Sequence, residues 1–242
     1  LEGGLLGYTD LEKRGSLMHP VQPLELPDTV PGDSLRVWFA NLETWLKSRD
    51  FYDGRNAIYS DQMKKDLIAD MNANAIPSRV TRRFGIVVTH SEARFFPTDV
   101  PGYSDTRVEM DLFQGSSLRV GKPVAILHTS VNGDFYYVES PIQRGWVAAE
   151  NVAVGTRAEV KKLALDKNIL MAASHRVPVY GDPKFRSFAR YLYYSSTMPF
   201  EKKDVDGYIV KMPYRRPDGM IGVARGYIRP DADVHRGFFP YT

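Results

Sequence analysis

The chain has 242 residues, of which 43% are hydrophobic and 25% charged, and it carries a net charge of +3. At roughly 150 residues per domain, this length predicts two or three small domains. The composition and charge argue against wholesale disorder and against a dedicated nucleic-acid binder. The sequence contains no run of about 18 apolar residues, so it predicts no membrane-spanning helix. The sequence contains no cysteine, which excludes disulfides, thiolate zinc sites and a cysteine nucleophile within this chain.

The first 33 residues predict an extended strap. Four prolines recur every three or four residues, a spacing that no helix accommodates; they are Pro20, Pro23, Pro27 and Pro31. Such a strap could lie across another domain, and the alternative is a leader without fixed structure. The chain begins with Leu1 rather than Met, which leaves open both the removal of a signal peptide and a trimmed N-terminus.

Two helices are predicted next. The first covers residues 34–49, where apolar side chains recur at helical spacing and Ser34 is a suitable N-cap. Its apolar residues are Leu35, Trp38, Phe39, Leu42, Trp45 and Leu46. The second covers residues 61–74, with Ser60 as its cap and Pro77 after its end. We expect the two tryptophans of the first helix to be core anchors rather than ligand-binding residues.

From Thr81 onward the sequence predicts short β-strands and tight turns, because runs rich in Val, Ile, Phe and Tyr alternate with Gly, Pro, Asn and Asp. Asn132-Gly133 is a strong hairpin signal. A short helix is predicted over residues 157–165, and residues 185–194 fit either a helix or a strand. The predicted strands are 84–89, 122–128, 135–139 and 146–149, followed by 177–180, 208–212 and 221–224.

The two β regions share a pattern. Residues 134–141 and 206–213 both follow D-x-Y-x-V-x-x-P, and each is followed by a glycine-bearing turn and another strand. The pattern indicates a duplicated module of about 70 residues, the size of a small β-barrel.

Short motifs offer one catalytic alternative. Residues 32–35 spell the GDSL string of a serine esterase family, and Asp231, Asp233 and His235 could complete a triad with Ser34. No apolar strand precedes the motif, and the Asp–His spacings differ from that family's, so helix capping explains the serine better. The five histidines are scattered without metal-ligand spacing, and we expect no metal and no cofactor.

Aromatic residues are the remaining signal. Because alternate residues of a barrel strand face inward, we expect about half of them in the core and the rest along a groove able to stack on sugars or peptides. Phe135, Tyr136, Tyr137 and Trp146 surround the first hairpin, and Tyr191, Tyr193 and Tyr194 lie in the second module.

Five segments carry a resemblance to a known family: residues 94–99 (RFFPTD), 110–118 (MDLFQGSSL), 121–130 (GKPVAILHTS), 134–138 (DFYYV) and 145–147 (GWV). They resemble the first bacterial SH3-like (SH3b) domain of the NlpC-like cell-wall cysteine peptidases, which are similar to gamma-D-glutamyl-L-diamino-acid endopeptidases. The tail, residues 232–242, resembles the stretch that ends their second SH3b domain and leads into the catalytic domain. The helical region before Arg82 is similar in placement to their N-terminal stabilising segment.

The resemblance implies a binding role rather than catalysis. The family's papain-like domain would begin where this chain stops, so the catalytic domain has been cut away, lies on another chain, or has been lost. In related enzymes the first SH3b domain flanks the active-site cleft and helps to restrict substrates to peptides with a free N-terminal L-Ala. The resemblance makes Arg94, Asp134, Tyr136, Tyr137 and Trp146 candidates for the peptide-facing wall, with Trp146 the one most expected to be buried.

These observations predict a mainly β fold in three parts: a helical N-terminal unit (residues 1–80), a first SH3b-like barrel (81–156) and a second SH3b-like barrel with a C-terminal linker (166–242). The expected function is the non-catalytic, stem-peptide-binding and substrate-restricting region of a bacterial peptidoglycan endopeptidase. Its partners would be peptidoglycan stem peptides or muropeptides and an NlpC-like catalytic domain, in the periplasmic or extracellular envelope. The alternative is a stand-alone envelope scaffold that binds another protein, and the serine esterase is third.

Overall fold

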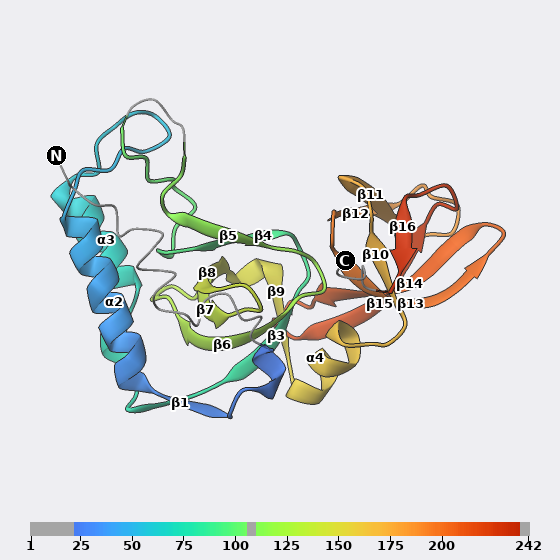
Figure 1. Cartoon of the computed structure of the whole chain (residues 1–242), viewed down its shortest axis with the longest axis horizontal. Helices are drawn as coiled ribbons and strands as arrows, with labels where there is room; N and C mark the ends of the chain where they lie inside the picture. Colours follow the sequence, from blue (N-terminus) through green and yellow to red (C-terminus); the bar gives the residue numbers. More distant parts are fainter. Residues whose placement is uncertain (1–21, 106–109, 238–242) are drawn as a thin grey trace, which may run out of the picture.

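The structure is a computed structural model that describes residues 22–105 and 110–237. Figure 1 shows an elongated molecule, with helices α2 and α3 at one end, the first sheet in the middle and the second sheet at the other end. The predicted fold class is confirmed: a small helical unit is followed by two seven-stranded sheets. The first 21 residues of the predicted strap, and the last five residues of the tail, lie outside the described residues.

The N-terminal unit is held together by a short strand pair and two helices. Strand β1 (Thr29–Pro31), from the described part of the proline-rich strap, pairs antiparallel with β2 (Arg79–Thr81). Between them lie α2 (Gly32–Lys47) and α3 (Asp61–Asp70). Two short 3-10 helices complete the unit, η1 (Pro23–Glu25) and η2 (Ala73–Ala75).

The helix ends test the predicted caps. The cap at Ser60 is confirmed, because its side chain accepts a hydrogen bond from the Met63 N–H. The cap at Ser34 is wrong: α2 begins two residues earlier, with Pro31 at the N-cap, and the Ser34 hydroxyl donates back to the Pro31 carbonyl at 2.7 Å. Helix α3 is shorter than predicted, since the chain turns left-handed at Asn72 (φ +54°).

The first sheet has the strand order β5-β4-β8-β7-β6-β3-β9, with every pairing antiparallel. The Asn132-Gly133 hairpin is confirmed: it connects β6 to β7, and Gly133 takes a φ of +80°. The short 3-10 helix η3 (Ala149–Asn151) separates the last two strands. The strands are β3 (Arg83–Val87), β4 (Ser91–Arg94), β5 (Gln114–Leu118), β6 (Pro123–Thr129), β7 (Phe135–Glu139), β8 (Arg144–Ala148) and β9 (Val152–Gly155).

Helix α4 (Arg157–Ala164) leads from the first sheet to the second and begins with a capping box between Thr156 and Glu159. The second sheet has the order β12-β11-β15-β14-β13-β10-β16. The segment that fitted either a helix or a strand contains β12. The strands are β10 (Ile169–Ala172), β11 (Arg176–Tyr180), β12 (Phe188–Tyr193), β13 (Thr197–Asp204), β14 (Gly207–Arg215), β15 (Ile221–Ile228) and β16 (Val234–Arg236).

The two sheets have the same topology. Numbered from its own first strand, each sheet has the same strand order, and β7 and β14, which carry the repeated sequence pattern, occupy the same place. The register agrees as well: Tyr136 is opposite Val147, and Tyr208 is opposite Ile228. Both edge pairs, β4–β5 and β11–β12, contain an irregularity just before the residue that contacts the next strand. The duplication inferred from the sequence therefore extends to details of the pairing.

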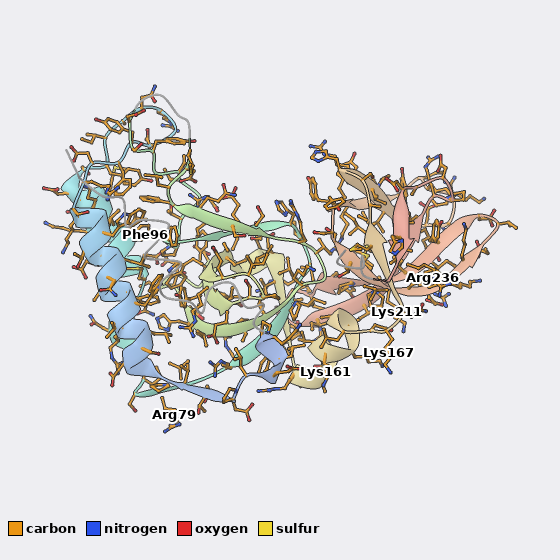
Figure 2. The ribbon with its side chains drawn as sticks, in the orientation of Figure 1. Arg79, Phe96, Lys161, Lys167, Lys211 and Arg236 are labelled. Atoms are coloured by element: carbon orange, nitrogen blue, oxygen red, sulfur yellow. The ribbon has the colours of Figure 1, made fainter. Side chains whose placement is uncertain are left out.

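The N-terminal helices cover one face of the first sheet. The ring of Phe39 in α2 contacts Tyr137 edge-on at a centroid distance of 5.0 Å and Trp146 at 5.4 Å. Farther along the helix, Trp45 stacks on Phe96 with centroids 5.8 Å apart and ring planes 1° from parallel. Figure 2 shows Phe96 beside α2. The helical unit and the first sheet thus share one hydrophobic core.

The two sheets also pack directly on each other. Val120 follows the first sheet's edge strand, yet it is buried among residues of the second sheet's core. The Thr197 N–H donates to the Val120 carbonyl at 3.0 Å, and the Val154 N–H donates to the Gly219 carbonyl at 2.9 Å.

In Figure 2, Lys161, Lys167, Lys211 and Arg236 lie along α4 and the second sheet. None of the described helices is long and apolar enough to cross a membrane.

Candidate functional site

A cavity of about 230 Å³ opens on the first sheet, beside β4. Its wall combines acidic, basic and aromatic side chains, among them His90, Glu92, Arg94, Asp99, Phe135 and Asn151. Strand β4 contributes Glu92 and Arg94, and β7 contributes Phe135. We refer to this space as the β4 cavity. One predicted site residue, Arg94, lines the cavity. A second, Asp134, directly precedes the lining residue Phe135 in the sequence.

Arg94 is buried in the wall of the β4 cavity and is held by two carboxylates. Its side chain is 3% exposed and pairs with Glu92, and its Nη2 lies 2.8 Å from the Asp111 carboxylate. The same nitrogen donates to the Val100 carbonyl at 3.2 Å. These contacts satisfy most of the guanidinium, and its Nε is buried without a partner within the described ranges. Arg94 is therefore placed to position Glu92 rather than to meet a ligand directly.

Glu92 is the exposed acid of the β4 cavity. Its side chain is 44% exposed, so the carboxylate remains accessible to solvent while one of its oxygens accepts from Arg94. Asp99 is also exposed at the cavity wall. Two accessible carboxylates beside a guanidinium that already pairs with the half-buried Asp111 give the cavity an acidic character. Such a site suits a cationic group, for example an amine.

His90 closes the β4 cavity on the side of the second sheet. Burial and the nearby Arg119 guanidinium hold the pKa of His90 below its usual value, which favours the neutral ring. The Arg119 Nη1 lies 3.0 Å from His90 Nδ1, and the ring lies 5.0 Å from that of Tyr193. The second sheet therefore shapes this edge of the cavity.

The predicted residues on β7 and β8 are not gathered on one exposed wall. Tyr137 and Trp146 are 1% and 0% exposed because Phe39 of α2 covers them. Burial raises the pKa of the Tyr137 hydroxyl. Tyr136, 9% exposed, points to the opposite side of β7 and into the barrel interior, with the Arg83 guanidinium over its ring at 5.2 Å. Asp134 alone among the predicted residues is exposed.

The strand alternation itself was expected, but the covering helix was not. Residues of β7 that point away from the barrel interior meet α2 instead of solvent, so they cannot form a groove in this structure. Sequence reasoning also missed Glu92, His90 and Asn151 as cavity residues. Glu92 lies two residues before Arg94 on the same strand face, which is the one sequence signal that could have identified it.

A larger cavity, of about 490 Å³, lies between α3 and the first sheet. Its lining is mainly apolar, with Tyr59, Met63, Leu67 and Val131 among its residues. Asp70 also lines it; burial raises the pKa of this carboxyl group, and nearby Asp134 acts in the same direction.

The esterase motif is not assembled into a site. Ser34 lies in α2, whereas His235 lies in β16, and Figure 1 places these elements at opposite ends of the molecule. The Ser34 hydroxyl is bonded to a backbone carbonyl rather than to a base. Across residues 22–105 and 110–237, no three His, Asp or Glu residues form a group able to hold a metal.

Comparison with known proteins identifies part of the chain. Residues 101–148 match the family model for an SH3 domain of the SH3b1 type. This segment contains β5 to β8, four of the seven strands of the first sheet. No curated protein matches the chain.

A solved structure shares most of the fold. The chain is similar to a novel NlpC/P60 endopeptidase from Photobacterium damselae subsp. piscicida, with a TM-score of 0.70 and 16% identity over 86% of this chain and 45% of that chain. This chain thus spans less than half the length of that structure. NlpC2 from Trichomonas vaginalis matches with 17% identity over 67% of this chain and 51% of that chain, but its TM-score of 0.23 carries no information about the fold.

Proposed function

We propose that this chain is the non-catalytic, substrate-binding region of a peptidoglycan endopeptidase and acts in the bacterial cell envelope. The match to an SH3b-type domain and the fold similarity to an NlpC/P60 endopeptidase support this assignment. The chain has no cysteine, so the nucleophile of such an enzyme would come from an NlpC-like catalytic domain in the same or another protein.

The acidic β4 cavity is the observation that carries the proposal. A stem peptide with a free N-terminal L-Ala presents an ammonium group and a methyl group. The exposed Glu92 carboxylate can accept a charge-assisted hydrogen bond from that ammonium, and Phe135 offers an apolar contact for the methyl group. A peptide whose amine is acylated loses the positive charge and most of the N–H donors of the ammonium group. The buried Arg94 guanidinium holds Glu92 in place whether or not a peptide is bound.

The proposed recognition revises the expected peptide-facing wall. Arg94 is proposed as a positioning residue and Asp134 as an outer contact, while Glu92 takes the central role. Tyr136, Tyr137 and Trp146 would support the wall from within the core.

Calorimetric titration with muropeptides tests this function. We expect binding of a muropeptide with a free N-terminal L-Ala, and about tenfold weaker binding after N-acetylation or in Glu92→Gln, since one charge-assisted hydrogen bond contributes about 1.5 kcal/mol. Glu150→Gln, a change of an exposed acid in η3, is the matched control. Equal affinity for the free and acetylated peptides would contradict the proposal. Absence of binding to either would favour the scaffold alternative.

A further inference from the structure

The second sheet presents an exposed group of aromatic side chains at its edge. Phe188 and Tyr191 on the edge strand β12 are 51% and 41% exposed. Tyr180, at the end of β11, and Phe185, on the connecting loop, lie beside them. We call these four residues the aromatic face. Large aromatic rings are seldom grouped on a surface without a binding role.

The four rings form a continuous surface. The ring centroids of Phe188 and Tyr191 are 4.7 Å apart, those of Tyr180 and Phe188 are 6.4 Å apart, and those of Tyr180 and Phe185 are 5.4 Å apart. The loop that carries Phe185 is fixed by Asp182, whose carboxylate accepts hydrogen bonds from the N–H groups of Lys184, Arg186 and Ser187. The backbone that carries Phe185 is therefore fixed by contacts within the loop itself.

Two arginines border the aromatic face. The Arg176 guanidinium lies 5.6 Å from the ring centroid of Tyr191, and that of Arg229 lies 5.3 Å from Phe185 and 5.6 Å from Tyr180. Both arginines are exposed, and neither makes an ion pair with another residue of the described ranges. The border thus offers two positive charges that no acid within residues 22–105 and 110–237 neutralises in an ion pair.

The duplicated first sheet shows that the fold does not need these rings. The β4–β5 and β11–β12 pairs share their register, so that Gln114 and Ser117 of the first sheet occupy the positions of Phe188 and Tyr191. The same strand pair therefore forms with small or polar residues at both places. The aromatic side chains are specific to the second sheet, and the pairing of the two strands does not require them.

We propose that the aromatic face binds a carboxylate-bearing glycan. The C–H groups on one face of a pyranose ring pack against the electron-rich face of an aromatic ring, and the sugar hydroxyls remain in water. Arg176 and Arg229 supply the positive charge that pairs with carboxylates along the chain. In the envelope setting, which rests on the proposed function, the ligand is a peptidoglycan glycan strand freed of stem peptides, because its lactyl carboxylates are then unsubstituted.

Co-sedimentation or titration of the whole chain with peptide-free glycan strands tests the inference. We expect saturable binding, at least tenfold weaker in the Phe188→Ala/Tyr191→Ala double variant and weaker in Arg176→Gln. Tyr191→Phe, which keeps the ring, should bind like the wild type. Tyr214→Ala removes a 38% exposed tyrosine from β14 and is the matched control. Circular dichroism and thermal unfolding establish that each variant is folded.

Further ligands separate the possible sources of binding. Neutral chitin oligosaccharides should bind more weakly than the carboxylated glycan, and poly-glutamate should not bind in an aromatic-dependent way. Failure to bind the glycan, or binding that the double variant leaves unchanged, overturns the inference. Binding of poly-glutamate as tight as that of the glycan also overturns it, because charge alone would then explain the affinity. Tighter binding of an extended peptide along β12 overturns it as well. Glu92→Gln should leave glycan binding unchanged, so failure of the muropeptide site would be seen separately.

Discussion

Arg82 and Glu139 form an ion pair at 2.8 Å, with side chains that are only 5% and 6% exposed. Arg82 follows β2, and Glu139 ends β7, so the pair connects the N-terminal unit to the first barrel. Through Nη1, Arg82 also donates to the carbonyls of Pro27 and Thr29, at 2.7 and 2.9 Å. A single guanidinium thus fastens the proline-rich strap to the sheet.

Replacing Arg82 by methionine should therefore be costly. The change keeps much of the side-chain volume but removes the charge opposite Glu139 and three hydrogen bonds. We expect the free energy of unfolding to fall by about 3 kcal/mol in chemical denaturation, the lower end of the range for a broken buried pair, because Arg144 still contacts Glu139. Arg79→Met, at an exposed position of β2, should change stability by less than about 0.5 kcal/mol. Similar losses for both variants would contradict this account.

Phe39→Ala tests whether the helical unit stabilises the first barrel. Phe39 is 1% exposed and contacts Tyr137, Trp146 and His128, so its removal leaves a cavity between α2 and the sheet. We expect a loss of about 3–5 kcal/mol and a red shift of tryptophan fluorescence as water approaches Trp146. Val37→Ala, at a 62% exposed position of the same helix, is the control. An unchanged unfolding midpoint for Phe39→Ala would show that the helices do not support the barrel.

The stability of the protein should depend on pH through two half-buried histidines, His128 and His90. Burial lowers the pKa of His128, whose ring packs near Phe39 and whose Nε2 donates to the Asn72 carbonyl at 3.0 Å. The unfolded chain, with a histidine pKa of about 6.5, therefore takes up a proton more readily than the folded one. Stability is full above about pH 6.5 and is lost as the pH falls through this value toward the lower folded pKa.

Denaturation series between about pH 7.5 and 5.5 measure the effect. We expect the slope against pH to be smaller in His128→Gln than in the wild type, with His90 contributing the remainder in the same direction. His175→Gln changes an exposed histidine and should leave the slope as it is. If the slope of His128→Gln equals that of the wild type, the titration of His128 does not contribute.

Two glycines with similar backbone conformations distinguish strain from contact. Gly121 and Gly133 have φ of +87° and +80°, so alanine at either position costs about 1–2 kcal/mol of conformational strain. At Gly121, a Cβ would also lie 2.1 Å from the Thr197 carbonyl oxygen of the second barrel, whereas nothing lies within 4 Å of a Cβ at Gly133. We expect Gly121→Ala to be clearly the more destabilising of the two by thermal unfolding. Equal losses would show that the contact between the barrels yields at little cost.

Local features of the fold could be predicted because they depend on neighbouring residues. The hairpin at Asn132-Gly133 and the cap at Ser60 follow from the conformations that those residue types favour. The start of α2 was misplaced because Pro31 precedes it in an extended conformation, and two acceptable starts lie within three residues. The first β region and its D-x-Y-x-V-x-x-P copy were predicted from the alternation and the repeat, and the shared strand order agrees with that prediction.

The candidate site was less accessible to prediction because its parts are distant in the sequence. Tyr137 and Trp146 are aromatic residues on strands, and nothing in their neighbourhood tells that Phe39, about 100 residues away, covers them. The β4 cavity joins β4, β7 and η3, and its geometry depends on the register of strands that are not consecutive. Of the two exposed rings of β12, Tyr191 is among the aromatic residues singled out from the sequence and Phe188 is not, and neither is assigned to a face, since strand and helix predictions give them different faces.

The placement of Val120 affects how a long polymer would bind. This residue belongs to the first barrel in sequence but is buried in the core of the second, and its carbonyl accepts from Thr197. The β4 cavity and the aromatic face are therefore held at one spacing instead of being joined by a loose tether. A wall fragment that carries both a stem peptide and a bare glycan segment of matching length would gain avidity, because binding at one surface raises the effective concentration at the other. A fragment whose two ligand groups are spaced differently would gain no avidity, so the rigid contact between the barrels would select wall fragments by length.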